Sequence, residues 1–290
     1  MRTEQEMLDL IVNAANSDDR IRAVAMNGSR TNPNAIRDIF QDYDIVYVVK
    51  ETKSFRENKH WIDQFGERLY MQYPEDTSYY PKDVENCYGW LMQFSDGNRL
   101  DLHVSTLNYV LEDMKKDSLY KVLLDKDDCI PFLPEASDKV YWIKKPSEKQ
   151  FLDTCNEFWW CLNNVAKGLW REEITYTMDM INYAVRPSLI DLLEWEIGLQ
   201  TDFSVSIGKS GKYMYRWLKE EKWNTFLRTY PSGIIKEIWD SVFIMCELFH
   251  STAKEVAEKM DFNYNEMEAK NSFKFLKDIY LLPKDATHIY

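Results

Sequence analysis

The spacing of apolar residues changes once along the chain, near residue 143. Before that point, short runs rich in β-branched and aromatic residues are separated by turn residues, which is typical of strands. We expect strands over residues 21–26, 42–49, 90–94 and 99–104. An Asp96-Gly97 turn between the last two runs predicts a hairpin.

Helical spacing of apolar residues marks both ends of the chain. A helix is expected over residues 1–16, where Thr3 and Glu6 form a capping box, and a short one over residues 34–40. After a linker at residues 144–147, Ser147 and Gln150 form a second capping box. Further helices are expected over residues 148–167, 171–185, 187–199, 211–227, 233–261 and 264–280, with Pro187 in a first turn.

These patterns predict an α+β fold in two domains. Residues 1–145 would form an N-terminal domain with a mixed β-sheet and helices, and residues 146–290 an all-α helical bundle. The chain has 290 residues, 45% of them hydrophobic, which is enough for two cores.

Composition and charge narrow the class of protein. A net charge of −12 argues against a nucleic-acid partner, because binding a polyanion requires a basic surface. No apolar run is long enough to span a membrane and no signal peptide is visible, so we expect a cytoplasmic protein. The sequence gives no indication of an obligate protein partner, and we expect none. The five cysteines form no CxxC pair and favour reduced thiols, and the four histidines are too scattered in sequence to indicate a zinc site.

Three aspartates stand out within the predicted strands. Asp42 and Asp44 are two positions apart, so their side chains point the same way, roughly 6 to 7 Å apart along the backbone. Asp101 shares a strand face with His103, away from Leu100 and Leu102. Carboxylates at this spacing can hold one magnesium ion or two. Taken alone, an Asp-x-Asp pair is more often a solvated strand edge, and Asp101 alone is also compatible with a position facing water on a half-exposed sheet.

A small-residue turn precedes the first two aspartates. Gly28 lets the backbone approach a phosphate closely, and the Ser29 hydroxyl and exposed amides can donate to its oxygens. Arg30 adds positive charge. A Gly-Ser turn alone is commonly an ordinary turn. The combination of motifs in this order, Gly-Ser, then Asp-x-Asp, then a later single aspartate, is what indicates a functional site.

In this order the motifs resemble the nucleotidyltransferase superfamily that includes DNA polymerase beta. Nearly the whole chain is similar to the aminoglycoside 6-adenylyltransferases, the streptomycin-modifying enzymes of bacteria. The similarity is carried by residues 27–30, 41–46, 99–101, 160–171 and 206–213. It implies a nucleotidyltransferase that uses ATP and Mg²⁺ to transfer AMP to a cationic aminoglycoside, by resemblance to the 6-hydroxyl of streptomycin, and so confers antibiotic resistance.

The resemblance implies roles for the aspartates and the turn. Asp42 and Asp44 would hold magnesium against the triphosphate, with Gly28, Ser29 and Arg30 binding the nucleotide. Asp101 would either accept the acceptor's proton or ligate a second ion, and the sequence leaves both roles open.

Residues 208–212 contain Gly-Lys-Ser but lack the first glycine of a P-loop, so they form no Walker motif. Two interpretations are open for Lys209 and Lys212: they belong to a solvated loop, or they contact the outer phosphates of the nucleotide. The resemblance favours phosphate contact.

The helical half is rich in tryptophans and acids, which suit a polyhydroxylated cation. Most of these residues are expected to have ordinary roles: a tryptophan here is more often part of the core, and an acid is at least as often part of a solvated helix face. We select Trp170, Glu172, Glu173 and Asp179 as substrate-binding candidates because they cluster near the family-like residues 160–171. Two alternatives stay open: transfer to another small-molecule or protein acceptor, and a non-catalytic nucleotide-binding module.

Overall fold

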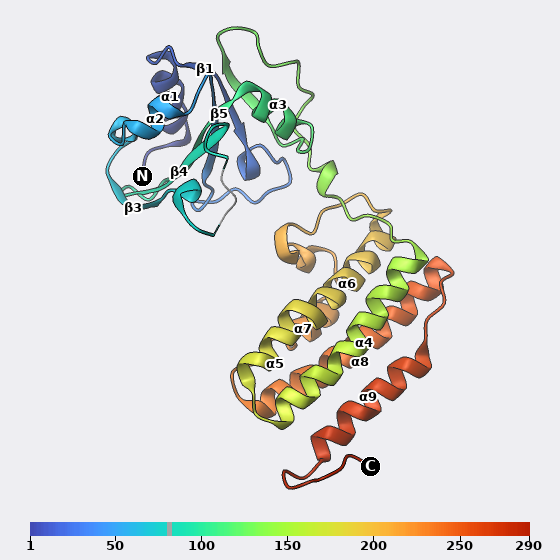
Figure 1. Cartoon of the computed structure of the whole chain (residues 1–290). Coiled ribbons are helices and arrows are strands. Elements are labelled where there is room, and N and C mark those ends of the chain that lie inside the picture. Colours follow the sequence, from blue (N-terminus) through green and yellow to red (C-terminus); the bar gives the residue numbers. More distant parts are fainter. Residues whose placement is uncertain (80–82) are drawn as a thin grey trace. The chain divides into compact units, whose positions relative to one another are not determined.

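The computed structural model describes residues 1–79 and 83–290. Contacts divide the chain into two compact units, residues 1–140 and 141–290 (Figure 1). The sequence predicted the domain boundary slightly later, after Lys145, within the linker at residues 144–147. Each unit has its own apolar core.

A mixed six-stranded sheet with order β3-β4-β5-β2-β1-β6 forms the centre of the first unit. The strands are β1 (Ile21–Asn27), β2 (Tyr43–Val49), β3 (Arg68–Gln72), β4 (Cys87–Phe94), β5 (Arg99–Thr106) and β6 (Lys121–Asp125). Neighbouring strands are antiparallel except for β2 and β5, which are parallel. The four strands expected from the sequence are therefore confirmed, as is the Asp96-Gly97 hairpin that joins β4 to β5.

Alternation along the strands separates an apolar face from a second face. Residues such as Tyr47, Leu102 and Trp90 belong to the main core together with α1 (Glu4–Asn16). The Thr3 capping box of α1 is confirmed, and the Tyr47 hydroxyl donates to the carbonyl of Ile11 at 2.6 Å. Two shorter helices, α2 (Lys53–Glu57) and α3 (Leu107–Met114), complete this unit, with 3₁₀ turns at Gly28–Arg30, Trp61–Phe65, Pro74–Asp76 and Lys139–Tyr141.

The second face, which we call the site face, carries the alternate residues of the strands. Asp44, Asp101 and His103 lie on it, because they alternate with the core residues of β2 and β5. Part of it forms a small apolar cluster in which Val46 and Val48 pack with Val110 of α3. The parity expected for Asp101 and His103 is thus confirmed.

The second unit is helical, which confirms the α+β class. It contains α4 (Glu148–Trp170), α5 (Ile174–Met180), α6 (Arg186–Thr201), α7 (Glu220–Leu227), α8 (Ile235–Met260) and α9 (Glu266–Leu281). Within it, α4 contacts α6, α8 and α9 (Figure 1). Phe158 and Phe249 stack in its core with ring centroids 3.7 Å apart, and the Ser147 capping box starts α4 as expected. No helix in the described part of the chain is long and apolar enough to cross a membrane.

Two expected helices differ from the structure. Residues 34–40 form turns, because the side chains of Asn32 and Asp38 accept hydrogen bonds from the backbone two residues on and compete with a helix. Residues 211–227 are helical only in part: Gly211 has a positive φ angle, Met214–Arg216 form a 3₁₀ turn, and α7 begins at Glu220.

The expected break before Pro187 is a π-helical segment, Ile181–Val185, that joins α5 to α6. The amide of Arg186 donates to the carbonyl of Ile181, five residues earlier, and Pro187 lies in the first turn of α6. A π-segment at this place accommodates the missing proline donor without ending the helix.

Candidate active site

Three neighbouring strands align the acidic residues on the site face. Asn27, the last residue of β1, pairs with Asp44 of β2, and Asp44 pairs with Asp101 of β5. Asp42 immediately precedes β2. Because β2 and β5 are parallel, their amino-terminal ends lie side by side at the same end of the sheet. Carboxylates that are far apart in sequence therefore come together at this end.

The carboxylates of Asp42, Asp44 and Asp101 form a compact cluster. One oxygen from each lies within 4.8 Å of the others, and all three residues are half-buried. Burial and, after it, the charges of Asp42 and Asp101 raise the pKa of Asp44 to about 7. Hard oxygen donors at this spacing suit Mg²⁺, whose charge would relieve the mutual repulsion of the carboxylates.

Arg99 is a member of this cluster that the sequence analysis assigned no role. Its Nε and Nη2 donate to the two oxygens of Asp101 at 2.8 and 2.6 Å, and Nε lies 3.8 Å from Asp42 Oδ2. The guanidinium therefore neutralises part of the acidic charge. Its position could have been predicted from strand alternation, because Arg99 and Asp101 are two positions apart on one strand and therefore lie on the same face.

Gly28 fits closely against Asp44. Its φ angle is +70°, and a Cβ at this position would lie 2.1 Å from Asp44 Oδ2. Only glycine satisfies both conditions, because other residues would be strained and would displace the carboxylate. The turn and the acidic cluster are thus one structural feature.

Ser29 and Arg30 follow in the same turn. Gln41 Nε2 donates to the Ser29 carbonyl at 3.2 Å, which ties the turn to the segment before β2. Arg30 donates to the carbonyls of Asp42 and Gln41, both at 2.9 Å, and its guanidinium stacks 3.7 Å from the Tyr43 ring centroid. In this structure Arg30 positions the backbone that carries Asp42.

A polar network also begins beside Asp44 that the sequence did not reveal. Asn27 Nδ2 donates to the Tyr120 hydroxyl at 3.1 Å, and that hydroxyl donates to Asp113 Oδ2 at 2.5 Å. Burial and the Asp113 carboxylate raise the pKa of Tyr120 well above its usual range. The network fixes the end of β1 against α3, which contains Asp113, and against the segment before β6, which contains Tyr120.

The remaining nucleotide-binding candidates lie in the second unit. Lys209 and Lys212 are exposed and flank a turn whose Gly208 has a φ angle of +71°. Lys212 Nζ lies 5.1 Å from the Tyr213 ring centroid. Both ammonium groups are therefore accessible to a ligand.

The substrate-binding candidates gather around the turn between α4 and α5. Trp170 Nε1 donates to the Leu282 carbonyl at 3.1 Å, and Glu172 pairs with Lys284 at 2.9 Å, so both contact the C-terminal segment. Glu173 lies 3.9 Å from Arg171. Asp179 is exposed on α5.

Two further acids on α6 differ from these. Asp191 and Glu194 lie one turn apart and have no hydrogen bond or ion pair with another described residue. Burial and, after it, the charge of Asp191 raise the pKa of Glu194 to about 7. A carboxylate that has lost water without gaining a partner favours a cationic ligand.

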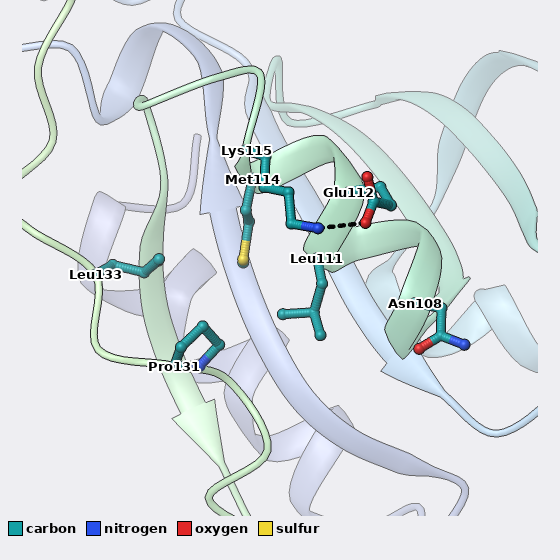
Figure 2. A pocket seen from close by; sticks show the side chains of 7 residues that line it. All are labelled: Asn108, Leu111, Glu112, Met114, Lys115, Pro131 and Leu133. Carbon is teal, nitrogen blue, oxygen red and sulfur yellow. Dashed lines mark hydrogen bonds and ion pairs between the residues drawn. The ribbon is translucent and has the colours of Figure 1, made fainter.

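A separate pocket of about 320 Å³ lies between α3 and the segment that includes Pro131 and Leu133 (Figure 2). Leu111 and Met114 contribute apolar surface to it, and Glu112 forms an ion pair with Lys115 at its edge. Its lining includes none of the acidic cluster.

Comparison with known proteins gives matches over almost the whole chain. The family model described as streptomycin adenylyltransferase matches residues 1–279. The aminoglycoside 6-adenylyltransferase of Bacillus subtilis (strain 168) is 41% identical over 97% of this chain and 99% of its own length. The enzymes of that name from Staphylococcus aureus and Campylobacter jejuni are 36% and 39% identical, over 97% and 94% of this chain and 99% and 94% of their own lengths. A crystal structure of an aminoglycoside 6-adenyltransferase from Bacillus subtilis matches with 36% identity and a TM-score of 0.48, covering 97% of this chain and 100% of that one.

Proposed function

Because this chain belongs to the streptomycin adenylyltransferase family, we propose that it transfers AMP from ATP to the 6-hydroxyl of streptomycin and so confers resistance to the antibiotic. The observation that carries the proposal is the cluster of Asp42, Asp44 and Asp101 against Gly28. It joins the proposed cation site to a glycine turn of the kind that can bind phosphate through backbone amides.

Asp42 and Asp44 would hold Mg²⁺, which neutralises triphosphate charge when bound. The acceptor hydroxyl attacks the α-phosphorus of ATP, the new O–P bond forms, and the bond to pyrophosphate breaks. Ser29 donates to the phosphates, and Arg30 acts through the position of Asp42. For Lys209 and Lys212 we keep the assignment to the outer phosphates, which their exposed charges support.

Asp101 has two candidate roles that make different predictions. As a general base it would take the hydroxyl proton, and its replacement by asparagine would remove a pKa from the rate profile. If Asp101 is instead a metal ligand, its replacement by asparagine would lower the affinity of the protein for Mg²⁺. Titration of Asp101→Asn with Mg²⁺ and a pH–rate profile of the same variant separate the two roles.

Acceptor binding calls for carboxylates that are free to meet a cation. Trp170, Glu172, Glu173 and Asp179 remain candidates, and Asp191 and Glu194 join them because no described residue neutralises them. Glu194→Gln should raise the KM for the aminoglycoside about tenfold with kcat little changed, as expected for one lost charge-assisted hydrogen bond. Glu258→Gln, the same exchange at an exposed position of α8 that is not a candidate for substrate binding, is the matched control.

The test is direct. Purified protein is incubated with ATP, Mg²⁺ and streptomycin, pyrophosphate release is measured, and the antibiotic is examined by mass spectrometry for added AMP. Adduct formation that disappears in Asp42→Asn and persists in Asp38→Asn, an aspartate outside the cluster, supports the proposal. Pyrophosphate release with another acceptor but not with streptomycin would contradict the acceptor, and ATP binding without release would contradict the reaction.

A further inference from the structure

We propose that Glu75, Cys87 and His103 form a second cation site, with the donor chemistry of Zn²⁺ rather than Mg²⁺. The described residues contain two groups whose ligand atoms lie within 4.8 Å of one another, and this is the one outside the aspartate cluster. The inference does not depend on the transfer of AMP.

The three ligands come from three elements that meet over one glycine. His103 of β5 pairs with Gly89 of β4, and the imidazole leans across it, because a Cβ on Gly89 would lie 2.5 Å from His103 Nε2. Glu75, in the 3₁₀ turn Pro74–Asp76, accepts a hydrogen bond from the Gly89 amide at 2.8 Å. Cys87 lies two residues before Gly89 and so on the same face.

Each side of this arrangement is supported by a neighbouring group. The Gly89 amide orients the Glu75 carboxylate, and the Ser105 hydroxyl donates to Cys87 Sγ at 3.3 Å. Burial raises the pKa of the Cys87 thiol, and the hydrogen bond from Ser105 opposes this shift. The thiolate is the form that binds a metal, so a bound cation would have to displace the thiol proton. Outer groups of this kind orient metal ligands in known sites and tune their affinity.

The donor set decides which cation fits. One imidazole nitrogen, one sulfur and one carboxylate oxygen match the three protein ligands of an open tetrahedral Zn²⁺ site, with water in the fourth position. Mg²⁺ requires oxygen donors and has low affinity for thiolate, so it favours the aspartate cluster. Binding releases the Cys87 thiol proton to solvent, and no redox step is involved.

The site would place a second positive charge near the catalytic candidates. His103 and Asp101 are two residues apart on the same face of β5, and Asp101 is among the groups that act on the pKa of His103. Sequence spacing could not reveal the site, because the ligands are separated by 12 and 16 residues and converge only through sheet pairing.

The test uses Co²⁺ as a spectroscopic substitute for Zn²⁺ in the full-length protein. Thiolate ligation gives an intense charge-transfer band in the near ultraviolet, which carboxylate ligation at the aspartate cluster does not give. We expect this band in the wild type at one equivalent of Co²⁺, its loss on addition of Zn²⁺, and its absence in Cys87→Ser. Cys129→Ser is the matched control, because Cys129 is also half-buried in the first unit and contacts a carboxylate, Asp125, at 3.4 Å.

A second variant guards against a fold defect in Cys87→Ser. Glu75→Gln keeps the thiol and the shape of the side chain, and it should weaken Co²⁺ binding about tenfold or more while keeping the thiolate band at saturation. Asp42→Asn should leave the band and its midpoint unchanged. Absence of a thiolate band in the wild type, or a band that persists in Cys87→Ser or disappears in Cys129→Ser, would overturn the proposal.

Discussion

Replacing Asp44 with asparagine should make the metal-free protein more stable while removing its proposed activity. The carboxylate of Asp44 is half-buried beside Asp42 and Asp101, and its pKa is raised from 3.8 to about 7. In the unfolded chain the same group ionises near 3.8. Ionising Asp44 at neutral pH therefore favours the unfolded state, and asparagine removes this penalty.

The size of the effect follows from the shift. About 3 pKa units at about 1.4 kcal/mol each set a ceiling of about 4 kcal/mol, reached above pH 7. An asparagine amide also loses water on burial, so we expect a gain of about 2 to 4 kcal/mol at pH 8. Because the folded pKa is the higher one, the wild type loses stability as the pH rises from about 4 to about 7. The gap between variant and wild type should thus grow by about 2.5 kcal/mol between pH 5 and pH 8.

The assay is urea unfolding in the presence of a chelator. Unfolding is monitored by hydrogen exchange of peptides from β2 and β5, so that the stability of the first unit is measured separately. Asp125→Asn is the control of opposite sign. Against the effect of burial, hydrogen bonds from the backbone of Ile130 and Cys129 lower the pKa of Asp125, so its loss should destabilise the protein at pH 8. An Asp44→Asn variant that is less stable than the wild type at pH 8, or a gap that is equal at both pH values, would refute the reasoning.

Three further changes have defined outcomes. Gly28→Ala should weaken Mg²⁺ binding at least about tenfold in calorimetry, because its Cβ would displace Asp44 and its φ angle is strained; Gly97→Ala, also at positive φ but with open space around the Cβ, should lose only about 1 kcal/mol of stability. Arg99→Gln should tighten Mg²⁺ binding without ATP several-fold, because the guanidinium competes for Asp101, and unchanged affinity would count against this. Against the effect of burial, hydrogen bonds from Arg2 and Asn98 lower the pKa of Asp96, so Asp96→Asn should lose about 2 kcal/mol at pH 7 and progressively less as the pH falls below 3.8, in thermal melts at pH 7 and pH 3.

The strands of the site were predictable because alternation is a local property. In β5 the apolar residues Leu100, Leu102 and Val104 occupy every second position, which places Asp101 on the other face. β2 is a nearly continuous apolar run, and Asp44 is recognisable there because it is its one charged residue. The capping boxes at Thr3 and Ser147 were equally local, since each joins a side chain to a backbone amide three residues away.

Features that depend on pairing between distant segments were not predictable. The register that sets Asn27, Asp44 and Asp101 in line is fixed by the pairing of β1, β2 and β5. The Asn27–Tyr120–Asp113 network depends on a further pairing, that of β1 with β6. The turns at residues 34–40 have enough apolar residues for a helix, but side-chain hydrogen bonds to the backbone prevail.

The helix boundary before Pro187 was mispredicted for a different reason. Proline is expected at a helix start, and the sequence carries no signal that distinguishes a start from a π-helical continuation. The hydrogen bond from Arg186 to the carbonyl five residues earlier is visible only in the structure.

The alignment of β1, β2 and β5 beside the aspartate cluster has a consequence for the order in which the site forms while the chain is being synthesised. β5 ends at Thr106, and β2 acquires its parallel neighbour only when that residue has left the ribosome. A nascent chain that stops before β5 has two of the three aspartates and lacks the strand that positions the third. The cation binding that we propose for these aspartates would therefore indicate that β5 has paired with β2. A series of ribosome-bound chains of increasing length should acquire it in one step, after the whole of β5 has emerged.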